Sequence, residues 1–197
     1  MTANGREDRT AFFREFLRRP MEVGSIIPSS RFLERRILNL GAVESSRSIV
    51  ELGPGTGGTT RAILEEMPAN GRLLSIELNP ELHAMVEEIR DDRLIAHRGN
   101  AVDLEHALRE HAMDPPELVI SGIPFSTMTA SVGRRVLEAV EGVLVPGGRF
   151  VAYQARGRVA ELCEPLMGVA DREVELLNIP PMRVYRWEKN GGRNGAG

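Results

Sequence analysis

The sequence predicts an α/β fold in which a mostly parallel β-sheet is covered by helices on both faces. Three observations predict it. Short apolar segments that favour strands alternate along the chain with helical segments of about 10–15 residues. The first strand is followed by a glycine-rich turn and then by a helix. The last two strands are joined only by residues 178–181, which is too short for a crossover and requires an antiparallel hairpin.

The chain begins with a predicted amphipathic helix over residues 11–19, capped by Thr10 and ended by Pro20. Its apolar side chains fall on one stripe, and arginines flank that stripe. The stripe consists of Phe12, Phe13, Phe16 and Leu17, and the flanking residues are Arg14, Arg18 and Arg19. One interpretation is a helix packed on the edge of the domain. The other is an interfacial helix that inserts its aromatic face into a bilayer while arginine contacts lipid phosphates.

A second helix is predicted over residues 31–40, with Ser29 or Ser30 as its cap and Gly41 as its stop. The first strand, residues 48–51, then leads into residues 53–57, where every second position is glycine. Glycine permits positive φ and lets a ligand approach the backbone closely. The helix that follows, residues 59–67, offers unpaired N–H groups at its start. This is the first half of a nucleotide-binding unit.

The second strand, residues 71–77, ends in Glu77, which lies 20 residues beyond Gly57 (77 − 57). A carboxylate at this place accepts hydrogen bonds from both hydroxyls of a ribose. The alternative is that Glu77 caps the helix that follows. Strand, glycine turn, helix, strand and terminal acid together predict an adenosine site.

The remaining elements continue the alternation of helices and strands. The sequence predicts a helix over 81–90 opened by Pro80, a strand over 94–98, a helix ending near 111, a strand over 117–121, a helix over 129–145, a strand over 149–153, a helix over 159–169, and strands over 172–177 and 183–188. Ligands of open α/β sheets bind beyond the carboxyl ends of the strands. We therefore expect the glycine turn, Glu77, Asn100 with Ala101, and residues 121–126 to meet in one crevice. Asn100 could instead be only a turn residue.

The composition limits the classes of function. The net charge of −3 argues against a broad basic nucleic-acid-binding surface. No apolar run approaches the roughly 20 residues of a membrane-spanning helix, and no signal peptide is recognised. The single cysteine, Cys163, is typical of a reducing cytoplasm. The four histidines, at positions 83, 97, 106 and 111, show no spacing typical of metal ligands, so no metal site is expected.

The stretch Glu51-Leu52-Gly53-Pro54-Gly55-Thr56-Gly57 resembles motif I of the class I S-adenosylmethionine (SAM)-dependent methyltransferases. The element order resembles their Rossmann-like seven-stranded sheet, with strand order 3-2-1-4-5-7-6. NAD is disfavoured, because its Gly-x-Gly-x-x-Gly spacing and a second nucleotide-binding half are absent. The resemblance implies cofactor-binding roles for eight residues. Gly53, Gly55 and Gly57 would approach the methionine part of SAM, and Glu77 would bind the ribose. Asn100 would bind the adenine amino group, and the Ala101 N–H would bind a ring nitrogen. Glu51 would order the loop, and Ser121 is a further candidate cofactor contact.

Ser121-Gly122-Ile123-Pro124-Phe125 occupies the position of motif IV, where nucleic-acid N-methyltransferases carry an Asn/Asp-Pro-Pro-Tyr-like element. That element positions the target amine. Ser121 replaces its amide or carboxylate, so base methylation is put in doubt and the carbonyls of Gly122 and Ile123 are expected to position the amine. Tyr153, near the end of the fifth strand, is a candidate for steering the amine or for a cation–π contact, or it is a core residue.

A closer resemblance is to the bacterial phospholipid N-methyltransferases, carried by residues 16–20, 23–29, 51–57, 121–124 and 178–185. It implies a cytoplasmic enzyme, peripheral on the inner face of the membrane. The enzyme would methylate phosphatidylethanolamine and its partly methylated derivatives and release S-adenosylhomocysteine (SAH). Its partners would be an amine-bearing phospholipid and an anionic surface, and not nucleic acid. The alternative is a soluble small molecule or RNA adenine, as in the rRNA adenine dimethyltransferases.

The expected domain organisation follows from these elements. Residues 1–40 would form the amphipathic helix and a lid segment, residues 41–189 the methyltransferase domain, and residues 190–197 a disordered tail.

Overall fold

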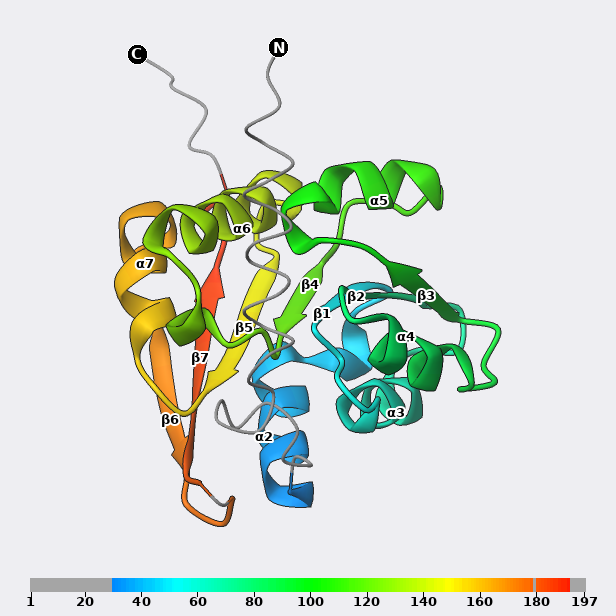
Figure 1. Cartoon of the computed structure of the whole chain (residues 1–197), viewed down its shortest axis with the longest axis horizontal. Helices are drawn as coiled ribbons and strands as arrows, with labels where there is room; N and C mark the ends of the chain where they lie inside the picture. Colours follow the sequence, from blue (N-terminus) through cyan, green and yellow to red (C-terminus); the bar gives the residue numbers. More distant parts are fainter. Residues whose placement is uncertain (1–29, 179, 192–197) are drawn as a thin grey trace.

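The computed structural model describes residues 30–178 and 180–191, so the predicted Phe-rich helix and its arginines lie outside the described residues. The described chain forms one seven-stranded sheet of order β3-β2-β1-β4-β5-β7-β6 (Figure 1). The strands are β1 Ser48–Leu52, β2 Arg72–Glu77, β3 Leu94–Arg98, β4 Leu118–Ser121, β5 Arg149–Gln154, β6 Asp171–Glu175 and β7 Met182–Glu188. Strand β7 pairs antiparallel with both β5 and β6, and the other pairs are parallel. The predicted strand order and terminal hairpin are confirmed.

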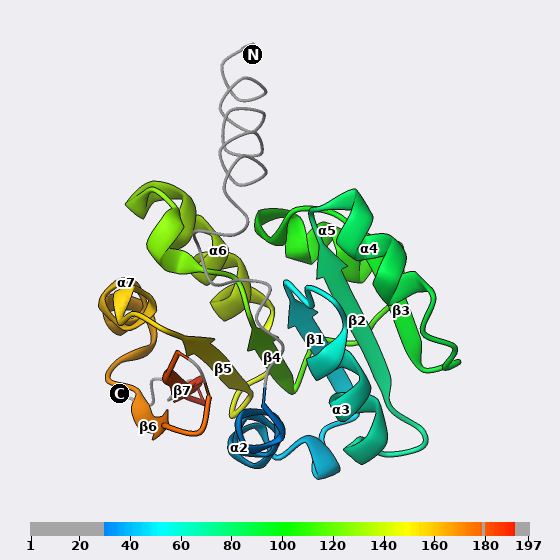
Figure 2. The same cartoon turned by 60° about the horizontal axis from the view of Figure 1, so that its bottom comes forward.

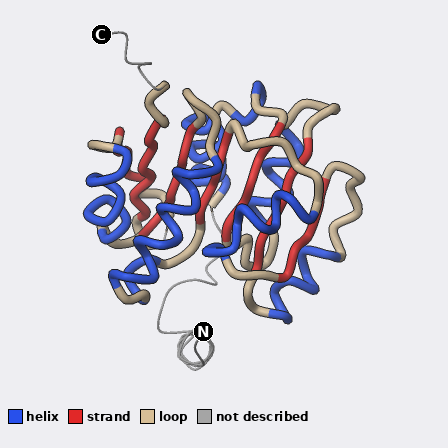
Figure 3. The backbone as a smooth tube through the Cα atoms, turned by 90° about the horizontal axis from the view of Figure 1, so that it is seen from above, coloured by secondary structure: helices blue, strands red, loops and turns tan. Residues whose placement is uncertain are grey.

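Helices cover both faces of the sheet because its strands are apolar on both sides. In β1, Ile49 packs into the core beneath α2 and α3, whereas Val50 and Leu52 pack into the core beneath α5, α6 and α7. Figure 2 shows α2 and α3 on one side of the strands and α5 and α6 on the other, and in Figure 3 the strands run side by side behind a layer of helices. The helices are α2 Arg31–Gly41, α3 Gly58–Glu66, α4 Pro80–Glu87, α5 Leu104–Glu110, α6 Ala130–Val143 and α7 Arg158–Met167, with 3₁₀ turns η1 Val43–Ser45, η2 Ala101–Asp103 and η3 Phe125–Thr127.

The start of helix α2 agrees with the prediction, and its end differs from it. Ser30 caps it, with Oγ accepting a hydrogen bond from the Leu33 N–H at 3.2 Å, as predicted. The predicted stop at Gly41 is wrong by one residue, since Ala42 adopts the left-handed conformation with φ of 50°. A Cβ on Gly41 would lie 2.9 Å from a methyl group of Leu118. Gly41 therefore serves the close packing of α2 on the sheet, and Ala42 makes the turn.

Other element ends differ from the prediction where side chains form turns. Strand β6 ends at Glu175 and not at Leu177, because the Glu175 carboxylate accepts a hydrogen bond from the Leu177 N–H at 2.8 Å. Helix α4 ends at Glu87 and not at Arg90. A turn held by Asp91, which accepts from the Arg93 N–H at 2.9 Å, then leads into β3. Helix α6 ends two residues early, with Leu144 in extended conformation.

The start of α2 is fixed to the turn between β6 and β7. Asn178 Oδ1 accepts a hydrogen bond from the Ser30 N–H at 3.0 Å, and Asn178 Nδ2 donates to the Pro180 carbonyl at 3.0 Å. Further along the helix, the Arg36 guanidinium pairs with the carboxylates of Glu173 and Glu175. The chain therefore enters the described fold beside the β6–β7 turn. Among the described residues, no helix combines the length and the apolarity needed to cross a bilayer.

Candidate active site

The carboxyl ends of the parallel strands meet at one edge of the sheet. The register pairs Leu52 of β1 with Ile76 of β2 on one side and with Ser121 of β4 on the other. Between β1 and β4 the strand order reverses, which is where open α/β sheets bind ligands. The structure therefore brings the predicted segments, which follow β1, β2, β3 and β4, to the same edge.

The glycine turn has the backbone conformation that its sequence predicts. Gly53, Gly55 and Gly57 have φ values of 72°, 58° and 81°, a region that strains residues with a Cβ. A Cβ on Gly53 would also lie 3.0 Å from Ile123 Cγ1 and 3.3 Å from the Ile123 nitrogen. The turn that follows β1 thus lies directly against the turn that follows β4.

Glu77 is almost fully buried and holds the glycine turn from the neighbouring strand. Its Oε1 accepts from the N–H groups of Leu78 and Asn79, both at 2.9 Å, and its Oε2 accepts from the Gly55 N–H at 3.3 Å. Burial raises the pKa of this carboxyl, and the backbone hydrogen bonds oppose that rise. Asn79 caps α4 by accepting from the N–H of Glu81 at 2.8 Å. Glu77 is therefore not the cap of that helix.

Glu51 lies completely buried beneath the turn. Its Oε2 accepts hydrogen bonds from the hydroxyls of Thr60 at 2.7 Å and Ser75 at 2.9 Å. Its Oε1 has no hydrogen-bond partner among the described residues, and burial raises the pKa of Glu51 to about 7. Glu51 therefore ties β1 to β2 and α3, and its contacts support the glycine turn from below.

Asn100 and Ala101 form the turn after β3. Asn100 Oδ1 accepts from the Val102 N–H at 3.2 Å and caps the 3₁₀ turn η2. No described residue accepts a hydrogen bond from the Ala101 N–H. A backbone donor and a side-chain amide are thus presented at this end of β3.

The turn after β4 is held by a residue that the sequence reasoning missed. Ser121 is buried, and its Oγ accepts from the Ile123 N–H at 3.3 Å. Gln154, the last residue of β5, donates from Nε2 to the Ile123 carbonyl and accepts from the Phe125 N–H at 3.2 Å. No described residue donates a hydrogen bond to the Gly122 carbonyl. The signal for Gln154 was a polar residue directly after the apolar run of residues 150–153.

Tyr153 lies against the same turn. An ideal Cβ on Gly122 would be 2.4 Å from Tyr153 Oη and 2.8 Å from the Gly53 carbonyl oxygen, so only glycine fits there. The phenol oxygen lies 3.4 Å from the Thr59 hydroxyl. Burial raises the pKa of Tyr153 far above its ordinary value, so the phenol stays protonated and can donate a hydrogen bond but not act as a base.

Comparisons with known proteins find relatives in sequence and neighbours in fold. No protein-family profile matches the chain. The chain is 27% identical over 146 residues to an ornithine lipid N-methyltransferase of Singulisphaera acidiphila, covering 73% of this chain and 76% of that protein. It is 35% identical over 98 residues to ribosomal RNA small subunit methyltransferase A of Caulobacter vibrioides, but this match spans only 36% of that protein.

Solved structures share the fold at low identity. The N-methyltransferase NodS of Bradyrhizobium japonicum, in complex with SAH, superposes with a TM-score of 0.69 at 14% identity, covering 91% of this chain and 97% of that one. The O-methyltransferase TomG of Streptomyces achromogenes, in complex with SAM, gives a TM-score of 0.66 at 14% identity, covering 84% of this chain and 82% of that one.

The strand order and these structural neighbours give the chain the Rossmann-like fold of the class I SAM-dependent methyltransferases. The predicted resemblance to lipid N-methyltransferases is confirmed by the Singulisphaera protein. The residues at this edge of the sheet fit SAM, because the glycine turn leaves no Cβ in the way and the Ala101 N–H has no partner among the described residues. The glycine turn, the Glu77 carboxylate, Asn100 and the Ala101 N–H would hold SAM, which when bound supplies an electrophilic methyl group.

Proposed function

We propose that this enzyme methylates the amine of a lipid head group at a membrane surface, with phosphatidylethanolamine and its partly methylated derivatives as substrates. The observation that carries the proposal is the match to an ornithine lipid N-methyltransferase across 73% of the chain. The turn after β4 supports it, since Ser121 offers no amide or carboxylate of the kind that nucleic-acid N-methyltransferases use.

The acceptor amine would be positioned by the backbone of the turn after β4. The Gly122 carbonyl has a free acceptor site among the described contacts and would take a hydrogen bond from the amine, aiming its lone pair at the methyl group. Gln154 holds the turn in place through Ile123 and Phe125. The amine must be neutral to attack. Because Tyr153 stays protonated, the ammonium proton leaves to water, and the phenol assists only by steering the amine.

The edge of the sheet that carries the site also carries exposed apolar side chains. Leu176 and Leu177, in the β6–β7 turn, are 72% and 64% exposed, and Phe32 on α2 is 57% exposed. This turn lies at the carboxyl end of the parallel strands, because Gln154 at the end of β5 pairs with Arg183 at the start of β7 (Figure 1). A bilayer contacting these side chains would place its head groups near the crevice.

Ser30, the first described residue, lies at the same place and donates a hydrogen bond to Asn178. The proposed membrane contact therefore combines the Phe-rich N-terminal segment with the β6–β7 turn. Burying each apolar side chain contributes roughly 1.5–3 kcal/mol, and arginine near an anionic surface adds about 1 kcal/mol.

The substrate is tested by incubating the protein with methyl-labelled SAM and separate pools of phosphatidylethanolamine vesicles, RNA and small amines. We expect label in the lipid fraction. Label only in RNA would favour the second candidate, an RNA adenine methyltransferase, which the match to the Caulobacter rRNA enzyme supports. Label only in a small amine would overturn both.

The membrane surface is tested by the double substitution Leu176→Ser and Leu177→Ser, with Val169→Ser as the control. Val169 is 84% exposed but precedes β6, at the opposite edge of the sheet. We expect the double variant to lose vesicle binding and lipid methylation while keeping SAM affinity, and Val169→Ser to behave as wild type. Deleting residues 1–19 should have the same effect with the melting temperature retained. Unchanged vesicle binding in both the double variant and the deletion variant would contradict a membrane role for this edge.

A further inference from the structure

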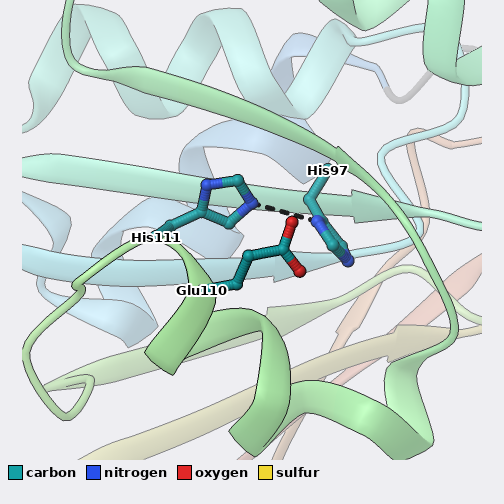
Figure 4. A group of neighbouring side chains, drawn as sticks. All are labelled: His97, Glu110 and His111. Carbon is teal, nitrogen blue, oxygen red and sulfur yellow. Dashed lines mark hydrogen bonds between the residues drawn. The ribbon is translucent and has the colours of Figure 1, made fainter.

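Three potential metal ligands converge at the β3 edge of the sheet (Figure 4). His97 lies on β3, Glu110 ends α5, and His111 follows directly after that helix. One donor atom from each residue lies within 4.8 Å of the others, and His97 Nδ1 is 3.0 Å from His111 Nε2. The spacing of these residues in the sequence did not predict this group. The three residues come together because the chain turns back between strand β3 and the end of helix α5.

The geometry suits a transition metal ion. Two nitrogens that each bind Zn²⁺ at about 2.0–2.1 Å in tetrahedral geometry lie about 3.3 Å apart. The two imidazole nitrogens need to separate by only about 0.3 Å from their hydrogen-bonded distance to reach that value. Imidazole together with a carboxylate favours Zn²⁺ and its transition-metal neighbours over Mg²⁺ or Ca²⁺.

The protonation state of the pair is also compatible with a metal. The hydrogen bond between the rings already requires one nitrogen to be an acceptor. For the donating ring to bind a metal through the same nitrogen, its proton moves to the other nitrogen of that ring.

We infer that His97, Glu110 and His111 form a binding site for a divalent transition metal ion. The ion links the end of β3 to the end of α5. The turn that carries Asn100 and Ala101 lies between these two elements in the chain. The His97 ring packs on the backbone of that turn, because a Cβ on Gly99 would lie 2.5 Å from His97 Nε2. An ion bound there would therefore stabilise the turn that carries Asn100 and Ala101.

The test is a calorimetric titration of tag-free, metal-stripped protein with Zn²⁺, together with melting curves with and without Zn²⁺. We expect one Zn²⁺ per chain, with a melting temperature that rises when the ion is added. His111→Gln should weaken Zn²⁺ binding about tenfold or more and abolish the rise. The matched control is His83→Gln, which alters a half-buried histidine on α4 outside the three-residue group.

Three outcomes of this experiment would overturn the proposed metal site. Wild-type affinity for Zn²⁺ in His111→Gln, or no saturable Zn²⁺ binding by wild-type protein, would overturn the site. Equal losses in His83→Gln and His111→Gln would also overturn it, since binding would then be distributed over surface histidines. His111 lies half-exposed just after a helix, so its variant is expected to fold even if His97→Gln does not.

Discussion

The proposed cofactor side and the proposed acceptor side of the site are built in different ways. On the cofactor side, three glycines with positive φ shape the turn, and Glu77 holds it through backbone N–H groups. On the acceptor side, the turn after β4 is held by Gln154, which comes from a strand about 30 residues further along the chain. A turn that is shaped by its own backbone can be recognised from a short sequence motif. A turn that is held by a residue of a distant strand can be recognised only once the fold is known.

The two sides also touch, and this limits which variants can separate them. A Cβ on Gly122 would press on Tyr153 and, at 2.8 Å, on the Gly53 carbonyl of the cofactor turn. Gly122→Val would therefore disturb SAM binding as well as the acceptor position. Variants of Glu77 and Gln154 distinguish the sides better, because Gly53, like Gly122, lies against the other turn.

The largest expected effect comes from Gly53→Val. A branched residue at φ of 72° is strained by roughly 1–3 kcal/mol, and its Cβ would contact Ile123. We expect SAM affinity to fall by about a hundredfold or more, measured by calorimetry. The matched control is Gly147→Val, which has a similar φ of 77° but no atom within 4 Å of its Cβ. It should lose comparable stability and keep SAM affinity. Equal SAM affinity in both variants would contradict the role of the turn.

On the acceptor side, Gln154→Ala should release the Ile123 carbonyl and the Phe125 N–H. A displaced turn misplaces the amine, and a misplacement of about 1 Å costs roughly a hundredfold in rate. We expect kcat to fall by about this factor with SAM affinity within about twofold of wild type. If SAM affinity fell as much as kcat, the two sides would not be separable at Gln154.

Glu77→Ala is expected to act on the cofactor alone. Loss of charged hydrogen bonds should weaken SAM binding by about 1–3 kcal/mol. Glu81→Ala is the control, because Glu81 is an exposed acid on the adjacent helix. Unchanged SAM affinity in a folded Glu77→Ala protein would mean that the carboxylate only orders the turn.

The smallest effect concerns Glu51 and pH. Burial raises its folded-state pKa from 4.5 to about 7, so the folded protein holds this proton more tightly than the unfolded chain does. Its contribution to stability is therefore full below about pH 4.5 and is lost as pH rises to about 7. Between about pH 5 and pH 8, wild type should lose about 1–3 kcal/mol relative to Glu51→Gln in urea unfolding. Glu44→Gln, an exposed control, should show no such trend. A pH-independent difference for Glu51→Gln would show that Glu51 is charged when folded.

The alternation of strands and helices, the terminal hairpin and the conformation of the glycine turn could be predicted from the sequence because they depend on local patterns. The strand order followed from the resemblance to the class I methyltransferases. The sequence did not predict Gln154, the tie between Ser30 and Asn178, or the meeting of His97 with His111, because each joins residues distant in sequence. It also misplaced the end of α2, where tight packing against Leu118 explains Gly41 better than helix termination does.

Titration of the wild-type protein with SAM, SAH and NAD by calorimetry tests the central claim most directly. A crevice built from the glycine turn, Glu77 and the Ala101 N–H should bind one SAM per chain, and SAH should compete for the same site. NAD should not compete, because the turn lacks the dinucleotide spacing. Saturable binding of NAD without binding of SAM or SAH would contradict the assignment of this crevice.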